Sequence, residues 1–528
     1  MKQAVFLLVL MASILLVDAT QAWQQRTRLQ RIADAITELD LGEAQRLLDE
    51  ADHDSPALSF ERARLAIYRG DCDTAAAILS APTYSSTEQG ASLGRLARSC
   101  AGATAAATVI RDHQLGVWVR LQDERDRVLV PLLVNVAARA RQSFARVLGV
   151  ELPRPLRLEI VRDNYSLSAV TGLPIEAAET TGTVAVARWG RVSMISPRAM
   201  PHGYPWEDTL AHEIVHLVLS RASRDRAPLW LQEGIAKRLE TRWRAERPFD
   251  VSSYDEVART ALLSGQSVGI DRLGPSIAML PSPDTARIAY AEVASFMNYW
   301  IDESGEPALS LLLADLRGTE TAGADSAMQS VTGYELGVWV ERWRRQLLSR
   351  PSNASSPSGG GPGGEGHPRS LKEMTLRAKI GEAARRVRLG DLLFDRGHSP
   401  EAAGQFDLAV AAAENEPAVR WRAARARLDS GEADQARERL GQEDDISSAH
   451  GAWFALRGRF LRQDGKQEDA QASFLLGIAL DPLREDVACE GHWMARSAQG
   501  GSAPKPFFPA EPTRRALCKE ARLLNRQD

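Results

Sequence analysis

The sequence predicts a mainly α-helical protein in which two helical flanks enclose a central α+β domain. Apolar residues recur at three- and four-residue steps through residues 26–112, a spacing typical of amphipathic helices. Near the C-terminus, glycines recur every 34 residues, at Gly397, Gly431 and Gly465. Between these flanks, a strand-like stretch precedes an apolar helical run. A length of 528 residues suffices for about three or four domains.

Balanced charge and scarce cysteine exclude several classes of protein. The 65 Lys and Arg against 69 Asp and Glu leave a net charge of −4, which argues against a polybasic nucleic-acid-binding protein. Four cysteines are too few for a disulfide-built scaffold, and no CxxC pair suggests a zinc ribbon. We therefore expect a multidomain protein of ordinary globular composition, with no nucleic acid partner.

The N-terminus has the features of a secretory signal peptide, predicted as residues 1–22. Residues 4–17 are apolar except for Ser13, and the small residues Thr20 and Ala22 stand at a possible cleavage site. A helix of this length spans about 21 Å, less than the roughly 30 Å hydrocarbon core of a bilayer. We expect an exported protein, periplasmic or secreted. An uncleaved N-terminal anchor is the alternative, and only then would the protein have a membrane partner.

Export would permit disulfides between the four cysteines. Cys72 and Cys100 are close in the sequence, as are Cys489 and Cys518, so two local bridges are the favoured connectivity. Each bridge would contribute about 3–4 kcal/mol if its geometry is unstrained. Two pairs of buried free thiols are the alternative.

The N-terminal flank, residues 23–112, is predicted to be helical throughout, as short antiparallel helix pairs. Its first apolar stripe has helical spacing and consists of Leu29, Ile32, Ile36 and Leu39. A second unit ends at Gly70 and is followed by Ala75 and Leu79.

The C-terminal flank, residues 371–528, keeps the 34-residue period at small and large apolar positions. These positions are Ala402, Ala436 and Ala470, and Phe406, Leu440 and Phe474. The pattern resembles the tetratricopeptide-repeat family over about residues 380–486, and the unit around Gly70 is a weaker match. The resemblance implies stacked helix pairs and a possible protein partner. Residues 351–370, rich in Gly, Pro and Ser, are predicted to form a flexible linker that separates this flank from the rest.

The central segment, residues 113–350, carries the chemistry. His212 and His216 stand one helical turn apart, so both imidazoles can reach one metal ion. Glu213 lies about 100° round the helix, close enough to hold a water without being a ligand. Their neighbours Ile214, Val215 and Leu217 predict a buried helix, which a rigid site requires.

A catalytic zinc ion needs a third protein ligand, and Glu233 is the candidate. It follows Trp230 and Leu231 and precedes Ile235, and a carboxylate among such neighbours is costly to bury without a cation. A surface position on an amphipathic helix is the alternative for Glu233 considered by itself. Together with the upstream histidines, the ligand interpretation is favoured.

These motifs resemble the gluzincin zinc metallopeptidases, in particular the small peptidase-MA-like domains. The resemblance covers about residues 150–349. It implies that His212, His216 and Glu233 bind one Zn²⁺ per chain and that Glu213 is the general base. It also places an edge strand over the cleft, matched here by a hairpin of residues 183–187 and 191–196. The gap of sixteen residues between His216 and Glu233 is shorter than in the related aminopeptidases, and their amine-binding motif is absent, so the choice between endo- and exopeptidase stays open.

Tyr290 resembles the family's transition-state tyrosine, which would make it a catalytic donor to the oxyanion. A half-buried core tyrosine is the alternative, with Tyr299 and Tyr204 as other candidate donors. His202 is more often a structural or surface histidine in such a loop than an active-site donor.

The favoured function is zinc-dependent hydrolysis of peptide bonds in a peptide or protein substrate recruited by the repeats. The alternative is a repeat scaffold whose peptidase-like domain is latent or inactive. Retention of Glu213, which is not a ligand, favours the enzyme. A structural zinc site is disfavoured because no cysteine lies between Cys100 and Cys489.

Overall fold

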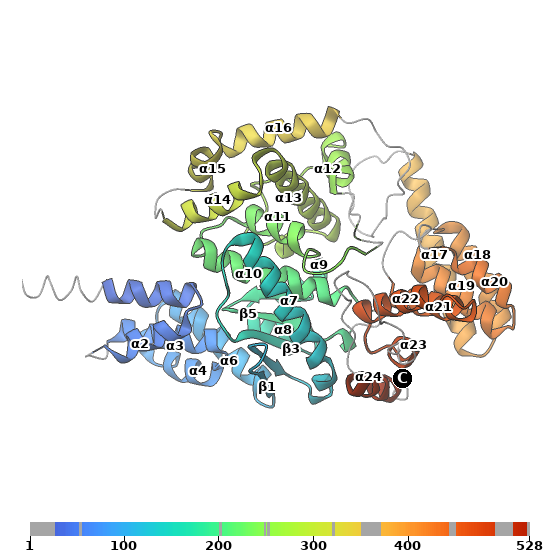
Figure 1. Ribbon diagram of the computed structural model, residues 1–528, viewed down its shortest axis with the longest axis horizontal. Coiled ribbons are helices and arrows are strands. Elements are labelled where there is room, and N and C mark those ends of the chain that lie inside the picture. Colours follow the sequence, from blue (N-terminus) through green and yellow to red (C-terminus); the bar gives the residue numbers. More distant parts are fainter. Residues whose placement is uncertain are drawn as a thin grey trace, which may run out of the picture.

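The computed structural model describes residues 27–51, 55–199, 203–247, 250, 254–318, 323–349, 371–414, 416–442, 450–490 and 511–524, without the side chains of 371–380, 490 and 511. Figure 1 shows N-terminal helices on the left, a sheet with its helices in the centre and C-terminal helices on the right. The predicted mainly α fold with a small central sheet is confirmed. The predicted signal peptide, 1–22, and linker, 351–370, lie outside the described residues.

The N-terminal helices pack as short hairpins. They are residues 27–37, α2 (Leu41–Asp49), α3 (Pro56–Arg69), α4 (Cys72–Leu79), α5 (Pro82–Ser85) and α6 (Glu88–Thr104). Polar side chains cap several of them: Asp40 accepts from the Glu43 N–H of α2, and Asp71 from the Thr74 N–H of α4. The buried apolar residues of these helices form two hydrophobic clusters.

The prediction of helix up to residue 112 is wrong at its end, because Thr108–Asp112 forms strand β1. Its β-branched residues pair antiparallel with β2 (Val117–Leu121). The other strands are β3 (Leu156–Val161), β4 (Ala185–Arg188) and β5 (Arg191–Ile195). The sheet has the order β1-β2-β3-β5-β4, with β2, β3 and β5 parallel and an antiparallel strand at each edge.

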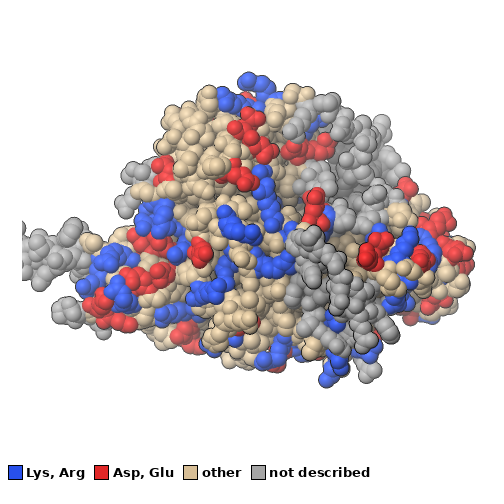
Figure 2. Space-filling view, viewed as in Figure 1, with Lys and Arg blue, Asp and Glu red and all other residues tan. Residues whose placement is uncertain are grey.

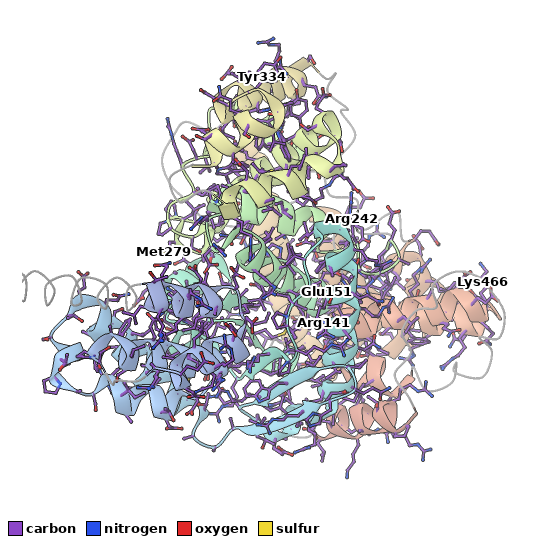
Figure 3. The ribbon with its side chains drawn as sticks, turned by 60° about the vertical axis from the view of Figure 1, so that its left-hand side comes forward. Arg141, Glu151, Arg242, Met279, Tyr334 and Lys466 are labelled. Carbon is purple, nitrogen blue, oxygen red and sulfur yellow. A yellow bond between two sulfur atoms is a disulfide. The ribbon has the colours of Figure 1, made fainter. Side chains whose placement is uncertain are left out.

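Helices cover this sheet and carry the rest of the central core. They are η1 (Glu124–Leu129), α7 (Val130–Leu148), α8 (Asn164–Thr171), α9 (Ile175–Thr181), η2 (Pro197–Ala199), α10 (Trp206–Ser223), α11 (Leu229–Leu239), α12 (Tyr254–Leu263), η3 (Ile277–Met279), α13 (Pro283–Ser304), α14 (Glu306–Gly318), α15 (Ala324–Thr332) and α16 (Leu336–Ser349). In Figure 3, Tyr334 marks the connection between α15 and α16 at the top of the molecule. Residues of α7, α10, α11 and α13 share one hydrophobic core with the strands.

A buried ionic cluster fixes the N-terminal helices to the sheet. Glu159 of β3 pairs with Arg120 of β2 and with Arg191 of β5, the latter at 2.7 Å. Each arginine also donates to the C-terminal end of α3: Arg120 to the Gly70 carbonyl and Arg191 to the Ile67 carbonyl, both at 2.5 Å. The two guanidinium groups share one carboxylate, and carbonyl oxygens at the negative, C-terminal end of α3 accept from both, so the cluster ties this helix to the sheet.

The C-terminal helices also form hairpins. They are α17 (Leu371–Asp395), α18 (Ser399–Ala412), α19 (Pro417–Asp429), α20 (Ala433–Leu440), α21 (Gly451–Gln463), α22 (Gln467–Leu480), α23 (Glu485–Glu490) and α24 (Glu511–Leu524). Gly397, Gly431 and Gly465, which follow α17, α19 and α21, have φ of 80°, 80° and 77°. This left-handed conformation explains the glycines at the 34-residue period. Lys466 marks the outer end of the α21–α22 hairpin in Figure 3.

The C-terminal helices contact the central domain, although the sequence predicts a linker before them. Tyr204 donates its N–H to the Leu480 carbonyl at 2.9 Å, and the Trp206 indole donates to the Ile478 carbonyl at 3.3 Å. Ile478 and Val487 belong to the same core as α10. The C-terminal helices are therefore attached to the first turn of α10 rather than separated from the central domain.

Both predicted disulfides are confirmed, Cys72–Cys100 and Cys489–Cys518. The first joins α4 to α6, and the second joins α23 to α24. Of the two alternatives left open by the sequence, buried free thiols are therefore wrong.

Charges of both signs occur on the surface. Figure 2 shows acidic and basic side chains on one face, with Lys and Arg most frequent over its middle. Among the described residues, no helix combines the length and the apolar character needed to cross a bilayer.

Candidate metal centre

Helix α10 holds the two predicted histidine ligands rigidly. Its first turn carries Asp208, which accepts hydrogen bonds from Arg244 and from the Trp243 indole at 3.2 Å. An acidic side chain there also suits the positive end of the helix dipole. Apolar residues surround the rest of the helix, and His212 keeps only 7% of its surface exposed. The site is thus built on a buried element that cannot easily shift.

The chain then reverses so that α11 brings Glu233 back over α10. Helix α10 ends at Ser223, and Arg224 and Asp225 follow in the left-handed conformation, with φ of 55° and 57°. Helix α11 begins at Leu229, directly after Pro228. This short connection accounts for the gap of sixteen residues between His216 and Glu233.

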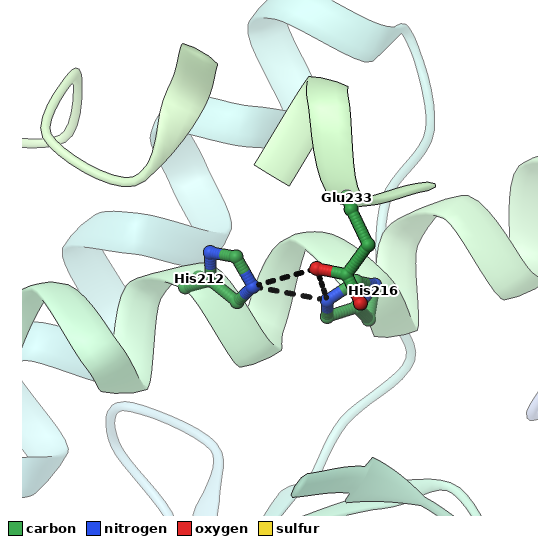
Figure 4. A group of neighbouring side chains, drawn as sticks. All are labelled: His212, His216 and Glu233. Carbon is green, nitrogen blue, oxygen red and sulfur yellow. Dashed lines mark hydrogen bonds and ion pairs between the residues drawn. The ribbon is translucent and has the colours of Figure 1, made fainter. Parts of the chain in front are cut away.

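The three predicted ligands meet at one point. The Nε2 atoms of His212 and His216 are 3.2 Å apart, and Glu233 Oε2 lies 3.3 Å from the first and 3.6 Å from the second (Figure 4). Ligand bonds of about 2.0–2.1 Å at tetrahedral angles place two donor atoms about 3.3–3.4 Å apart. The triangle of donors therefore has the size that a tetrahedral Zn²⁺ ion requires, with one position left for water or substrate.

The electrostatics of this triangle also fit a cation. Glu233 Oε2 is buried and, within the described part of the chain, accepts no hydrogen bond. Burial raises the pKa of Glu233, but the two imidazoles outweigh burial and hold it well below its usual range. Burial lowers the pKa of His212, but Glu233 and Glu240 more than compensate and raise it to about 9. A metal ion would replace that proton as the positive charge that pairs with Glu233.

Glu240 is a site residue that the sequence analysis missed. It stands at the C-terminal end of α11, and its Oε2 lies 2.9 Å from His212 Nδ1. A carboxylate on the second ring nitrogen orients a metal-binding histidine and leaves Nε2 for the metal. Lys237 pairs with the same carboxylate at 3.0 Å. A signal was present, because Glu240 follows Glu233 by seven residues and so lies on the same face two helical turns later.

The predicted general base, Glu213, lies under the edge strand of the sheet. Its Oε2 accepts the Ala187 N–H of β4 at 2.6 Å. The Val184 carbonyl accepts from Ile195, so Val184 and Val186 face β5 while Ala185 and Ala187 face the free edge. The predicted hairpin is confirmed, and its edge points towards the metal centre.

Tyr290 lies beside the three ligands. Its ring centroid is 6.5 Å from that of His212, and the Lys237 ammonium lies 5.1 Å from the Tyr290 ring centroid. Burial, followed by the charges of Glu233, Glu213 and Glu240, raises the pKa of its phenol well above 10. The group is therefore a neutral hydrogen-bond donor at any physiological pH.

The other candidate donors lie elsewhere. Tyr299 packs edge-on against Trp339, with ring centroids 6.2 Å apart, and Tyr204 donates its hydroxyl to the Ile195 carbonyl at 2.5 Å. His202 lies outside the described residues. Of the three tyrosines considered from the sequence, only Tyr290 adjoins the metal centre.

Comparison with known proteins supports a peptidase domain in the centre of the chain. Residues 136–349 match the family described as the Peptidase MA superfamily, which supports a gluzincin-type domain there. The match includes the three ligand candidates, Glu213 and Tyr290, and it leaves out β1, β2 and both helical flanks. No curated protein was found to match the chain.

Proposed function

We propose that this protein is a zinc-dependent peptidase. The observation that supports it best is the triangle formed by His212, His216 and Glu233, whose size fits a tetrahedral zinc ion. Glu213 and Tyr290 complete the set of groups that peptide hydrolysis needs. A latent scaffold would have no use for a carboxylate that adjoins the ligands without being one.

The chain's own residues would divide the chemistry as follows. A bound zinc ion would act as a Lewis acid on the attacking water and on the scissile carbonyl. Glu213 takes a proton from the water and transfers it to the leaving nitrogen. Its Oε2 is held by the Ala187 N–H, so Oε1 is the oxygen that carries the proton. Tyr290 donates to the oxyanion, a contact whose loss costs about 3–4 kcal/mol in comparable enzymes.

The edge of β4 offers a binding site for an extended peptide. The N–H and carbonyl of Ala185 and the carbonyl of Ala187 face outward and can pair with a substrate backbone by strand addition, while the Ala187 N–H stays bonded to Glu213. Such pairing would fix the peptide beside Glu213 regardless of its side chains. The substrate would therefore be an unfolded or extended segment of a peptide or protein.

Features of the two flanking regions support two further parts of the proposal, the location of the protein and its partners. Disulfides form and persist mainly in oxidising compartments, so the two observed bridges support export to the periplasm or beyond. The period of Gly397, Gly431 and Gly465 supports tetratricopeptide-like repeats, which would recruit a protein substrate or partner.

A cleavage profile of an extract tests the peptidase directly. Wild-type protein and Glu213→Gln would each be incubated with a periplasmic extract, and new peptide termini identified by mass spectrometry. We expect new termini with the wild type only, because the variant keeps the metal and loses the base. Identical profiles with both proteins would contradict peptidase activity, and capture of a partner without cleavage would favour the scaffold.

A further inference from the structure

A cavity separate from the metal centre has the composition of an anion-binding site. It has a volume of about 270 Å³ and lies between the N-terminal helices and the N-terminal end of β3. We propose that it binds a phosphate group, either free phosphate or the phosphate of a small monoester. The proposal is independent of the peptidase function.

Positive charge dominates the lining. Arg69, Arg154 and Arg157 line the cavity, and Asp40 is the only acidic residue among the lining residues. Asp40 already accepts the Glu43 N–H as the N-terminal cap of α2. The charges of Arg69 and Arg157 act on each other, and Arg154 adds a third basic residue to the lining.

Arg157 is the residue that most needs a counter-ion. Its Nε is buried and has no hydrogen-bond partner among the described residues, and Nη1 donates only weakly to the Pro155 carbonyl, at 3.3 Å. Burial, followed by the charges of Arg69 and Arg191, lowers its pKa to about 10. A partly buried guanidinium surrounded by like charges is costly unless an anion joins it.

Fixed donors complete the site. Arg69 is held in place because it donates to Gln45 Oε1 at 2.5 Å and to the Leu41 carbonyl at 3.0 Å. The first turn of α2, Leu41 and Gly42, lines the same cavity. Amide groups in a first helical turn lack partners within the helix and favour anions. Arginine forks and helix amides are the donors that proteins use for phosphate.

The volume of the cavity limits the size of the ligand, and its position determines which elements a bound ligand would connect. Since a water molecule takes about 30 Å³, the volume holds a phosphate with a small organic group or several waters. Gly190, in the β4–β5 turn, and Leu217, next to His216, also line it. A bound anion would therefore join the N-terminal helices to the hairpin and to α10, and it would stabilise the whole chain.

Calorimetric titration of the full chain tests the proposal. Metal-free protein would be titrated at low ionic strength with inorganic phosphate and with glycerol 1-phosphate, so that zinc cannot bind either probe. We expect saturable binding of at least one probe, and the tighter of the two identifies free phosphate or a monoester as the source. Arg157→Gln should weaken that binding at least about tenfold. Arg146→Gln, an exposed arginine of α7 with the same change of charge, should leave it unchanged.

Thermal unfolding measurements show whether Arg157→Gln loses phosphate binding only because it is less well folded. In phosphate-free buffer, Arg157→Gln should be at least as stable as the wild type, because it removes a repulsive, partly buried charge. Phosphate should raise the melting temperature of the wild type and of Arg146→Gln but not of Arg157→Gln. Absence of saturable binding by the wild type, or equal binding by Arg157→Gln, would overturn the proposal.

Discussion

At the scale of residues, the metal centre depends on how its imidazoles are oriented. His212 presents Nε2 to Glu233 because its Nδ1 faces Glu240, and Glu240 is in turn held by Lys237. Burial raises the pKa of Glu240, but Lys237 and His212 outweigh burial and lower it to about 2. The carboxylate stays ionised, so it can fix the histidine over the whole useful pH range.

Replacing Glu240 by Gln should therefore weaken zinc binding without abolishing it. Loss of such a carboxylate behind a histidine ligand typically costs about 10–100-fold in metal affinity. Competition with a chromophoric chelator measures that change. Glu246→Gln, at an exposed position six residues later, serves as the control and should bind zinc like the wild type. Equal affinities for both variants would show that Glu240 does not orient the ligand.

Tyr290→Phe should lower kcat and leave the zinc content unchanged. Removing one oxyanion donor costs about 10²–10³ in kcat in comparable enzymes. Tyr299→Phe is a matched control on the same helix, because Tyr299 packs against Trp339 away from the ligands. Steady-state kinetics with a peptide substrate of the wild type measure the change in kcat for both variants. If both variants lose the same activity, Tyr290 has a packing role only.

The candidate ligands could be predicted from the sequence because each carries a local signal, whereas Glu240 and the Ala187 N–H were not predicted because their roles depend on contacts between elements. His212, Glu213 and His216 follow from helical spacing, and Glu233 follows from the cost of burying a carboxylate among apolar side chains. The Ala187 N–H carries no sequence signal, because any residue except proline at that point of β4 would offer the same donor.

At the scale of elements, α11 and α13 pack unusually closely beside Glu233. A Cβ on Gly234 would lie 2.2 Å from Met297 Cγ and 2.8 Å from the Val293 carbonyl oxygen. Only glycine allows this approach, which brings α13 and its Tyr290 next to the ligand helix. The pair Glu233-Gly234 thus combines a proposed metal ligand with the close contact that places Tyr290.

Gly234→Ala should force α11 and α13 apart. Overpacking of this kind costs about 1–3 kcal/mol of stability, and it should also reduce activity because Tyr290 moves with α13. Gly404→Ala in α18 is the control, since nothing lies within 4 Å of its added Cβ. Thermal denaturation should show a lower melting temperature for the first variant and an equal or higher one for the second. Equal melting temperatures would mean that the helices can adjust.

Element type was more predictable than element boundary. The helices of both flanks follow from their apolar period, whereas β1 was missed because five residues give little periodic signal. Its partner β2 is buried along its whole length, so its sequence lacks the alternation of a surface strand.

At the scale of the whole molecule, the C-terminal helices contact the central domain through α22. Asp481, directly after α22, is buried there, and its Cβ lies 2.7 Å from where a Cβ on Gly203 would stand. Burial raises the pKa of Asp481 to about 7, although Arg484 opposes this and Asp486 adds to it. No sequence pattern predicts this contact, because its two sides are distant in the chain.

This interface should be more stable at mildly acidic pH. An aspartate with a pKa of about 7 when folded and about 3.9 when unfolded binds more protons in the native state between those values. Stability therefore falls as pH rises through that interval, by at most about 4 kcal/mol. Asp481→Asn should remove this dependence and raise the melting temperature at pH 8. Melting temperatures of both proteins between pH 5 and pH 8 test it, and identical slopes would refute the role of Asp481.

Zinc analysis of purified variants tests the central claim most directly. The three-ligand centre predicts about one zinc ion per chain in the wild type and in Glu213→Gln, measured by inductively coupled plasma mass spectrometry after dialysis. Glu233→Gln, which removes a ligand while keeping the shape of the side chain, should retain far less. A wild type that binds no zinc, or a Glu233→Gln variant that binds as much as Glu213→Gln, would contradict the account.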